Sequence, residues 1–216
     1  MQTIWMCASI LEQMFLKCLL LFAAAAPLPR VVLIGDSVRG GYQPVVERRL
    51  EGLAEIVGPG GSTTRSVLEN LEAWIIARNP EVIHINCGLH DCAIEKTGEL
   101  RVPLEEYRRN LEAIFGRLRR DTRARIIWAT TTPVNWEREV LVPPRLMRRD
   151  SDVRAYNTAS VEIARRFEVE INDLYGVVTS AGRDTQLGED GIHFTEAGYE
   201  LIGKVVAEAI RARLPR

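Results

Sequence analysis

The sequence predicts an α/β fold in which helices cover both faces of a five-stranded parallel sheet. Two observations carry this prediction. Short apolar runs alternate five times with segments of helical spacing, which is typical of parallel sheets with right-handed crossovers. The chain has 216 residues, 46% of them hydrophobic, and no internal repeat, which suits one core of good size. We therefore expect a single domain over residues 30–216.

The first predicted strand is the apolar run 31–34, which ends in Gly35, Asp36 and Ser37. Four aliphatic residues before a glycine are typical of a fully buried strand, and we expect this strand at the centre of the sheet. Ser37 then lies at the carboxyl end of the strand, where ligands bind in open α/β sheets. A serine in this place acts as a nucleophile, a phosphate ligand or a helix cap, and this stretch alone leaves all three roles open.

The remaining elements follow from periodicity. Predicted helices cover residues 42–53, 67–75, 103–118, 153–167 and 197–214, and predicted strands cover 54–57, 81–87, 124–130 and 169–171. After the fourth strand, a long loop runs from Thr131 through Pro144. Because loops of this length are uncommon in compact domains unless they have a role, we expect this one to be functional.

Polar residues and glycines gather in four loops that follow, or reach, the same sheet edge. These loops carry Ser37, Gly61, His90 and the pair formed by Asp190 and His193. Acyl transfer requires a nucleophilic hydroxyl, an imidazole that takes its proton, an acid that orients the imidazole, and donors for the developing oxyanion. The four loops together provide each of these groups.

Asp190 and His193 stand three residues apart, in a turn that contains Gly191 and precedes the last predicted helix. In one interpretation the carboxylate reaches one ring nitrogen while the other nitrogen points toward Ser37. In the alternative interpretation, Asp190 caps the turn and His193 packs at the start of the helix. The pair alone leaves both interpretations open.

Other groupings of these residue types point to no cofactor. His84 lies inside the third predicted strand, so we expect a structural histidine. Cys87, His90 and Cys92 match no zinc spacing, so we expect no metal. We expect the two cysteines to be buried and unpaired; the alternative is a short-range disulfide between them. The chain lacks a Walker lysine motif and a Gly-x-Gly-x-x-Gly loop after the first strand, which argues against a phosphate or flavin site. It also lacks the Gly-x-Ser-x-Gly elbow of α/β-hydrolases.

The charge balance and the amino terminus bear on partners and location. With 28 basic and 29 acidic residues the formal charge is -1, which argues against a nucleic-acid partner. Residues 1–29 predict a signal peptide, because the apolar stretch from Leu16 to Ala26 ends in four alanines and is too short to span a bilayer. The usual basic start is present only if translation begins at Met14. We expect export without stable membrane insertion; the alternative is a disordered leader on a cytoplasmic protein.

Four short blocks in this chain resemble the SGNH hydrolases, also called the GDSL esterase/lipase family. In the family's order, the blocks are Gly35-Asp36-Ser37-Val38, Gly61, Gly88-Leu89-His90-Asp91 and Asp190-Gly191-Ile192-His193. Val38 stands in place of the leucine of the family name, and His90 stands in place of an asparagine. The resemblance covers nearly all of the chain after the leader.

The resemblance implies a flavodoxin-like three-layer α/β/α sandwich and hydrolysis of a carboxylic ester through an acyl-serine intermediate, without a cofactor. Ser37 would be the nucleophile, His193 the general base and Asp190 the orienting acid. The backbone N–H groups of Ser37 and Gly61 and the ring of His90 would form the oxyanion hole.

Two further residues are candidates for contact with the substrate: Arg39, beside the nucleophile, and Trp136, in the long loop. We expect a small-molecule or glycan ester with a short acyl group, such as acetyl on carbohydrate. Because His90 replaces the asparagine, the alternative function is a non-catalytic or very slow binding domain for an acylated ligand. Nothing in the sequence indicates the oligomeric state.

Overall fold

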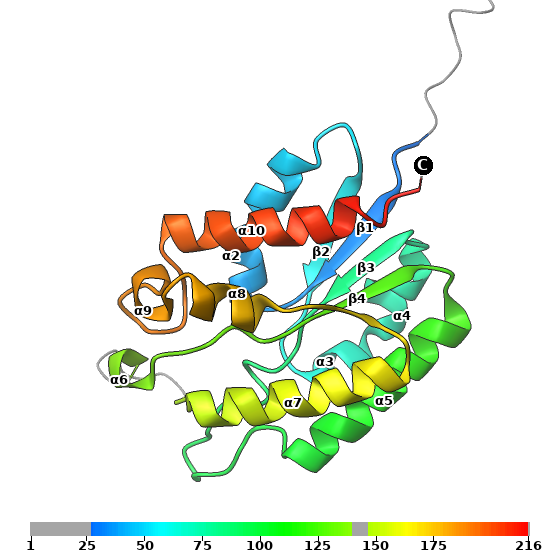
Figure 1. The fold of residues 1–216 in the computed structure, drawn as a ribbon. Coiled ribbons are helices and arrows are strands. Elements are labelled where there is room, and N and C mark those ends of the chain that lie inside the picture. Colours follow the sequence, from blue (N-terminus) through cyan, green and yellow to red (C-terminus); the bar gives the residue numbers. More distant parts are fainter. Residues whose placement is uncertain (1–26, 140–146, 216) are drawn as a thin grey trace, which may run out of the picture.

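One parallel sheet forms the centre of the molecule (Figure 1). The computed structural model describes residues 27–139 and 147–215, so nearly all of the predicted signal peptide lies outside the described residues. The strands are β1 (Arg30–Ile34), β2 (Glu55–Gly60), β3 (Val82–Ile85), β4 (Arg125–Ala129) and β5 (Glu170–Asn172), in the order β2-β1-β3-β4-β5. Every neighbouring pair is parallel, which confirms the predicted fold class. The expected central position of the first strand is wrong: after β2 the chain crosses back past β1, and β3, β4 and β5 extend the sheet on that side, so β3 is central.

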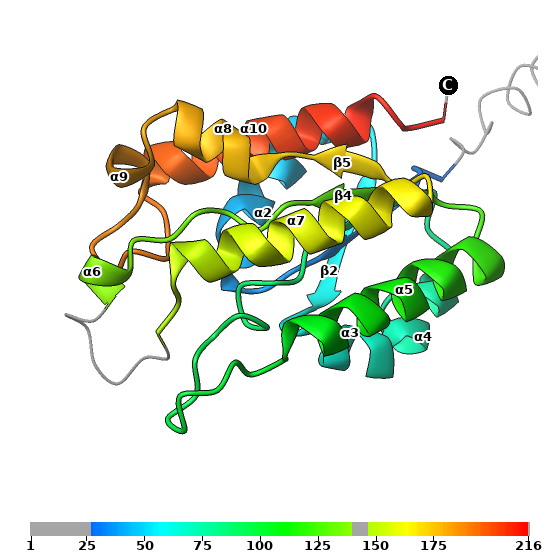
Figure 2. The same cartoon turned by 60° about the horizontal axis from the view of Figure 1, so that its bottom comes forward.

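Helices cover both faces of this sheet and complete three layers (Figures 1 and 2). They are α2 (Ser37–Arg49), α3 (Thr64–Glu69), α4 (Leu71–Trp74), the 3-10 turn η1 (Ile76–Arg78), α5 (Leu104–Asp121), α6 (Trp136–Glu139), α7 (Asp150–Arg166), α8 (Leu174–Ser180), α9 (Arg183–Gln186) and α10 (Glu196–Arg211). α2, α8 and α10 pack together on one face, and α3, α4, α5 and α7 cover the other. Within residues 27–139 and 147–215, no helix is long and apolar enough to cross a membrane.

The strands form the core because their side chains are buried between the two helix layers. β3 is buried along its whole length and β1 beyond its first residue. Phe115 of α5 packs edge-on against Trp128 of β4, with ring centroids 5.5 Å apart. His84 is buried with its Nε2 3.2 Å from the Asn172 side chain, and burial lowers the pKa of its ring to about 3. The expected structural role of His84 is therefore confirmed.

Several helix boundaries differ from the predicted ones for local reasons. α2 begins at Ser37 and not at residue 42, because Asp36 caps the helix by accepting the Val38 N–H at 2.9 Å. Gly41 lies inside this helix, and a larger residue would not fit at this position because its Cβ would stand 2.1 Å from the Tyr199 ring. The predicted helix over 67–75 is divided between α3 and α4. α8 and α9 have no predicted counterpart, since seven and four residues are too few for periodicity to detect.

Candidate active site

Ser37 is the first residue of α2 and follows the turn after β1. Asp36 provides the helix cap, so the serine hydroxyl is left for another role. The Ser37 residue is exposed, although β1 behind it is buried. Its backbone N–H belongs to the first turn of a helix, where N–H groups have no partner within the helix and the helix dipole is positive. The structure therefore presents a hydroxyl and an amide donor at the same point.

His193 connects Ser37 to Asp190. Its Nε2 lies 2.8 Å from Ser37 Oγ, and its Nδ1 lies 2.6 Å from Asp190 Oδ2. The other carboxylate oxygen accepts the backbone N–H groups of Ile192 at 3.0 Å and His193 at 2.9 Å. Asp190 therefore caps its turn and binds the imidazole at the same time. The sequence left open whether Asp190 caps the turn or orients the ring; one carboxylate oxygen does the first and the other does the second.

These hydrogen bonds keep the Asp190 carboxyl ionised. Burial by itself raises the pKa of this group, but the bonds from the His193 ring and from the two backbone N–H groups outweigh burial and hold the pKa well below its usual range. A carboxylate anion beside Nδ1 favours the imidazole tautomer that carries its proton there. Nε2 is then an acceptor for the Ser37 proton.

The turn that carries Asp190 and His193 is held by the beginning of the long loop after β4. The N–H of Asn135 donates to the Gly191 carbonyl at 2.8 Å, and the Arg138 guanidinium donates to two further carbonyls of the same turn. Gly191 has a φ of +70°, and a Cβ there would stand 2.1 Å from the Asn135 carbonyl oxygen. Glycine alone fits this contact. The long loop therefore contributes to the site by fixing this turn.

Gly61 lies against the turn that precedes the nucleophile. Its φ of +135° is one that other residues rarely adopt, and a Cβ would stand 2.6 Å from the Gly35 backbone nitrogen. The Gly35 N–H also donates to the Gly60 carbonyl at 3.3 Å. This close approach brings the backbone of Gly61 next to the segment that ends in Ser37, as the predicted oxyanion hole requires.

His90 is half-buried in the loop after β3. Its Nδ1 lies 3.3 Å from the Arg101 guanidinium, which also donates to Glu95 at 2.6 Å. Burial lowers the pKa of the His90 ring; the charge of Asp36 opposes this effect, and the charges of Arg148 and Arg101 add to it. The ring is therefore a neutral imidazole at neutral pH.

Asp91 and Arg148 are buried charged residues that support this edge and that the sequence analysis did not single out. Asp91 accepts the N–H and the hydroxyl of Thr64 at 2.9 and 2.5 Å, which joins the loop after β2 to the loop after β3. Burial raises the pKa of Asp91 to about 6, although the bonds from Thr64 lower it. Arg148 donates to the Leu89 carbonyl at 2.6 Å. The third block ends in Asp91, which was a signal for it, whereas Arg148 lies in an ordinary run of basic residues.

The two candidates for substrate contact occupy different surroundings. Arg39 is half-buried in the first turn of α2, where its guanidinium donates to the Gly35 carbonyl at 3.3 Å and to the Gln43 side chain. Trp136 is 48% exposed at the start of α6 and borders a hollow of about 520 Å³ together with Met147. The contacts of both residues with a substrate stay predictions.

The predicted cysteine state is confirmed, since Cys87 and Cys92 are free and buried. Burial raises the pKa of both thiols, so neither is a reactive thiolate at neutral pH. Among the side chains of residues 27–139 and 147–215, no group of three or more His, Cys, Asp and Glu is arranged to hold a metal ion.

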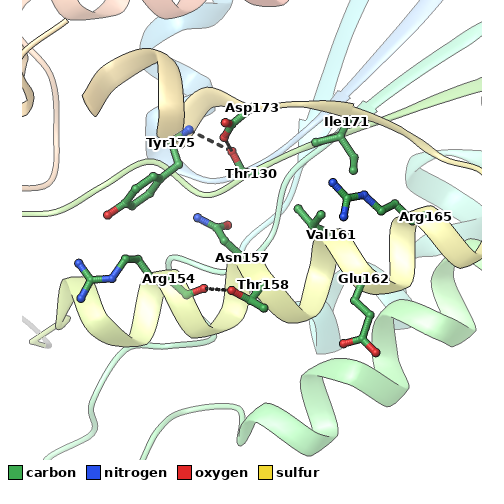
Figure 3. Close-up of a pocket in the computed structure, with 10 residues that line it drawn as sticks. All are labelled: Thr130, Arg154, Asn157, Thr158, Val161, Glu162, Arg165, Ile171, Asp173 and Tyr175. Atoms are coloured by element: carbon green, nitrogen blue, oxygen red, sulfur yellow. Dashed lines mark hydrogen bonds between the residues drawn. The ribbon is translucent and has the colours of Figure 1, made fainter. Parts of the chain in front are cut away.

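A hollow of about 830 Å³ opens between α7 and β5, away from the predicted site residues (Figure 3). Its polar walls are bonded to one another: the Thr130 hydroxyl donates to Asp173 at 2.9 Å and accepts the Tyr175 N–H at 3.0 Å. No nucleophile and base face each other there. The hydroxyl, imidazole and carboxylate bonded in series lie instead at the edge that carries Ser37.

Curated relatives of this chain are named as esterases. The human isoamyl acetate-hydrolyzing esterase 1 homolog is 26% identical over 193 residues, which cover 81% of this chain and 78% of the relative. The isoamyl acetate-hydrolyzing esterase of Schizosaccharomyces pombe is also 26% identical, with 86% and 76% covered.

Solved structures share the fold at lower identity. A lipase/acylhydrolase from Enterococcus faecalis superposes with a TM-score of 0.75 at 22% identity, covering 87% of this chain and 98% of the other. An acetylxylan esterase from Geobacillus stearothermophilus superposes with a TM-score of 0.70 at 20% identity, covering 85% and 94%. Residues 31–201 match the GDSL-like Lipase/Acylhydrolase family. The chain therefore belongs to this family and is a carboxylic ester hydrolase of the GDSL type.

Proposed function

We propose that this esterase hydrolyses small esters with short acyl groups, acetyl groups above all, through an acyl-serine intermediate. The observation that carries the proposal is the series Ser37, His193 and Asp190, whose neighbouring side chains lie 2.8 and 2.6 Å apart. A hydroxyl, an imidazole and a carboxylate bonded in this order form the arrangement that acyl transfer requires.

In the first half of the reaction, Ser37 Oγ attacks the carbonyl carbon of the ester and His193 Nε2 takes the hydroxyl proton. The carbonyl oxygen becomes an oxyanion that accepts hydrogen bonds from the N–H groups of Ser37 and Gly61 and from the His90 ring. Asp190 stabilises the imidazolium that forms. The ester C–O bond then breaks, and the imidazolium gives its proton to the leaving alkoxide while the acyl group stays on Ser37.

In the second half, a water molecule is the nucleophile and Ser37 Oγ is the leaving group. His193 removes a proton from the water molecule, whose oxygen attacks the acyl carbon and produces a second oxyanion in the same hole. The bond to Ser37 Oγ breaks, and His193 returns the proton to this oxygen. The carboxylic acid leaves, and the serine hydroxyl is restored. Every proton transfer uses the same Nε2, which is why the ring must be held by Asp190.

The names of the relatives support acetyl as the acyl group. Two curated relatives are named for isoamyl acetate, and one structural neighbour is named an acetylxylan esterase. The alcohol parts differ, an aliphatic alcohol in one case and a carbohydrate in the other, but the acetyl group is common to both. The exposed ring of Trp136 offers a surface for either alcohol part, and Arg39 lies two residues from the nucleophile.

A series of p-nitrophenyl esters of increasing acyl length tests this proposal, with Ser37→Ala as the inactive reference. We expect kcat/KM to be highest for the acetate and to fall with chain length, and we expect Ser37→Ala to leave only background hydrolysis. A maximum at long chains would contradict the acyl preference. Equal rates in the two proteins would favour a binding domain. Isoamyl acetate and acetylated xylooligosaccharide, compared as substrates, then distinguish the two kinds of alcohol.

We further propose that the protein is exported by the segment that precedes the fold. The support is the apolar stretch from Leu16 to Ala26 with its alanine-rich end, which is typical of a signal peptide. Amino-terminal sequencing of the protein collected outside the cytoplasm should find a start close to Pro27. Retention of Met1 or Met14 in that material would contradict export by cleavage.

A further inference from the structure

We propose that Arg101 is a positioning residue for ester hydrolysis, which acts by holding His90 in the tautomer that carries its proton on Nε2. The proposal rests on the function proposed above, in which the His90 ring donates a hydrogen bond to the oxyanion. A positioning residue is needed here because a histidine stands in place of the asparagine of the family pattern. An amide always presents N–H donors, whereas each nitrogen of a neutral imidazole is a donor in only one of two tautomers.

The contact between the two side chains decides which tautomer is present. A terminal nitrogen of the Arg101 guanidinium lies 3.3 Å from Nδ1 of His90. A guanidinium has five N–H donors, no acceptor, and a charge that it keeps at every accessible pH. Nδ1 must therefore be the acceptor, and the single proton of the neutral ring lies on Nε2. In an imidazolium, Nδ1 would also carry a proton, and this N–H would face an N–H of the guanidinium. The contact therefore also disfavours protonation of the ring.

Most of the charged groups around His90 also disfavour protonation of its ring. Arg101 and Arg148 disfavour a second proton on the ring, as do His193 and burial, and the charge of Asp36 opposes them. Arg101 is the one hydrogen-bond partner of the ring in the described part of the chain, and it binds at Nδ1. Nε2 is thus available to a ligand.

Arg101 is itself held in place by two anchors. Its Nε donates to Glu95 at 2.6 Å, and its backbone N–H donates to the Ala93 carbonyl at 2.8 Å. The next residue, Val102, donates its N–H to the Asp91 carbonyl at 3.0 Å. Arg101 is therefore tied to the same loop that carries His90. The series Glu95, Arg101 and His90 orients an imidazole from Nδ1, as Asp190 orients His193, but it selects the opposite tautomer.

Nuclear magnetic resonance of the ring nitrogens tests the tautomer without turnover. The chain has three histidines, so long-range ¹H–¹⁵N correlations can be assigned by substituting His90. In the wild type we expect an Nε2–H ring with an unprotonated Nδ1, and in Arg101→Met we expect a mixture of tautomers or a raised pKa. A wild-type ring protonated on Nδ1, or an Arg101→Met spectrum identical to that of the wild type, would overturn the proposal.

Kinetics then show whether the tautomer matters. We expect Arg101→Met to lower kcat on p-nitrophenyl acetate by about tenfold with little change in KM, less than the 10² to 10³ typical for loss of an oxyanion donor. In a His90→Asn background the same substitution should cost nothing further, because an amide has no tautomer to select. Equal losses in both backgrounds would overturn the positioning role.

Arg117→Met is the matched control for these experiments. Its side chain is 35% exposed against 30% for Arg101, it pairs with Glu72 and Asp121, and it lies on α5 outside the site. We expect it to change neither the His90 spectrum nor kcat. An inactive wild type would reveal failure of the proposed function, whereas a wrong tautomer would reveal failure of the Arg101 proposal, so the two failures are distinguishable.

Discussion

Both oxygens of the Asp190 carboxylate bind His193: Oδ2 lies 2.6 Å from the ring Nδ1, and Oδ1 lies 2.9 Å from the backbone nitrogen. The same side chain therefore fixes the backbone turn and the plane of the imidazole. The remaining ring nitrogen then has one orientation, 2.8 Å from Ser37 Oγ. This two-point attachment explains how a short turn before α10 fixes the imidazole that we propose as the general base.

Asp190→Asn separates these two roles. The remaining carbonyl oxygen can still accept the backbone N–H groups, but the new amide N–H donates to Nδ1 and moves the ring proton to Nε2. We expect kcat to fall by about 10²- to 10⁴-fold with a small change in melting temperature, because the wrong tautomer cannot accept the Ser37 proton. Asp173→Asn is the control: Asp173 caps α8 through the Gly176 N–H at 3.0 Å and should leave kcat unchanged. Comparable losses in both variants would contradict a tautomer effect.

Substitution of His90 tests whether its ring is the third oxyanion donor, as we propose. We expect His90→Ala to lower kcat by about 10² to 10³ with little change in KM, since an oxyanion donor acts mainly in the transition state. His90→Asn keeps an N–H donor and should stay much closer to the wild type. Steady-state kinetics on p-nitrophenyl acetate measure both. A sharp increase of kcat in His90→Asn would remove the case for a tuned histidine donor.

Gly191→Ala tests the contact that holds the catalytic turn. The new Cβ would meet the Asn135 carbonyl oxygen at 2.1 Å, so the turn must shift and carry His193 away from Ser37. We expect a fall in kcat of about 10²-fold, the effect of a displacement on the order of 1 Å. Gly52→Ala is the control for backbone strain, because Gly52 has a φ of +71° and no atom within 4 Å of the added Cβ. Equal activities of the two variants would contradict the role of the contact.

Asp91 should make stability depend on pH. Its pKa of about 6 lies above the ordinary value of 3.8, so between about pH 4 and 6 the folded state binds more protons than the unfolded state. The free energy of unfolding therefore falls as pH rises through this window, by up to about 3 kcal/mol for this group. Asp91→Asn keeps an acceptor for Thr64 and removes the titration. Urea unfolding at several pH values should show that the variant gains stability over the wild type as pH rises; a constant difference would contradict this account.

The sequence indicated the proposed catalytic groups because each stands in a short block at the end of a strand or before a helix. Parallel strands bring their carboxyl ends to one edge, so a parallel sheet predicts that the loops carrying Ser37, Gly61 and His90 lie at the same edge. Asp190 and His193 form a local turn, and local geometry is readable from spacing. The choice between a cap and an orienting acid was not readable, because it depends on where the second carboxylate oxygen points.

Other features depended on packing that no local pattern describes. Arg101 reaches His90 across eleven positions through a loop whose shape is set by backbone bonds such as Arg101 N–H to Ala93. The predicted helix start at residue 42 was wrong because the Asp36 cap begins α2 at Ser37, and the close approach of Tyr199 requires a glycine at position 41 inside the helix. Capping and side-chain contact decided these cases, not propensity.

Activation of the Ser37 hydroxyl by His193 can be tested by covalent labelling with an organophosphorus serine probe. Mass spectrometry of the digested protein should find one label, on the peptide that contains Ser37. Labelling should become much slower in His193→Ala, and Ser62→Ala, in the neighbouring loop, should react like the wild type. Absence of label from the folded wild type, or a label on another serine, would contradict the account.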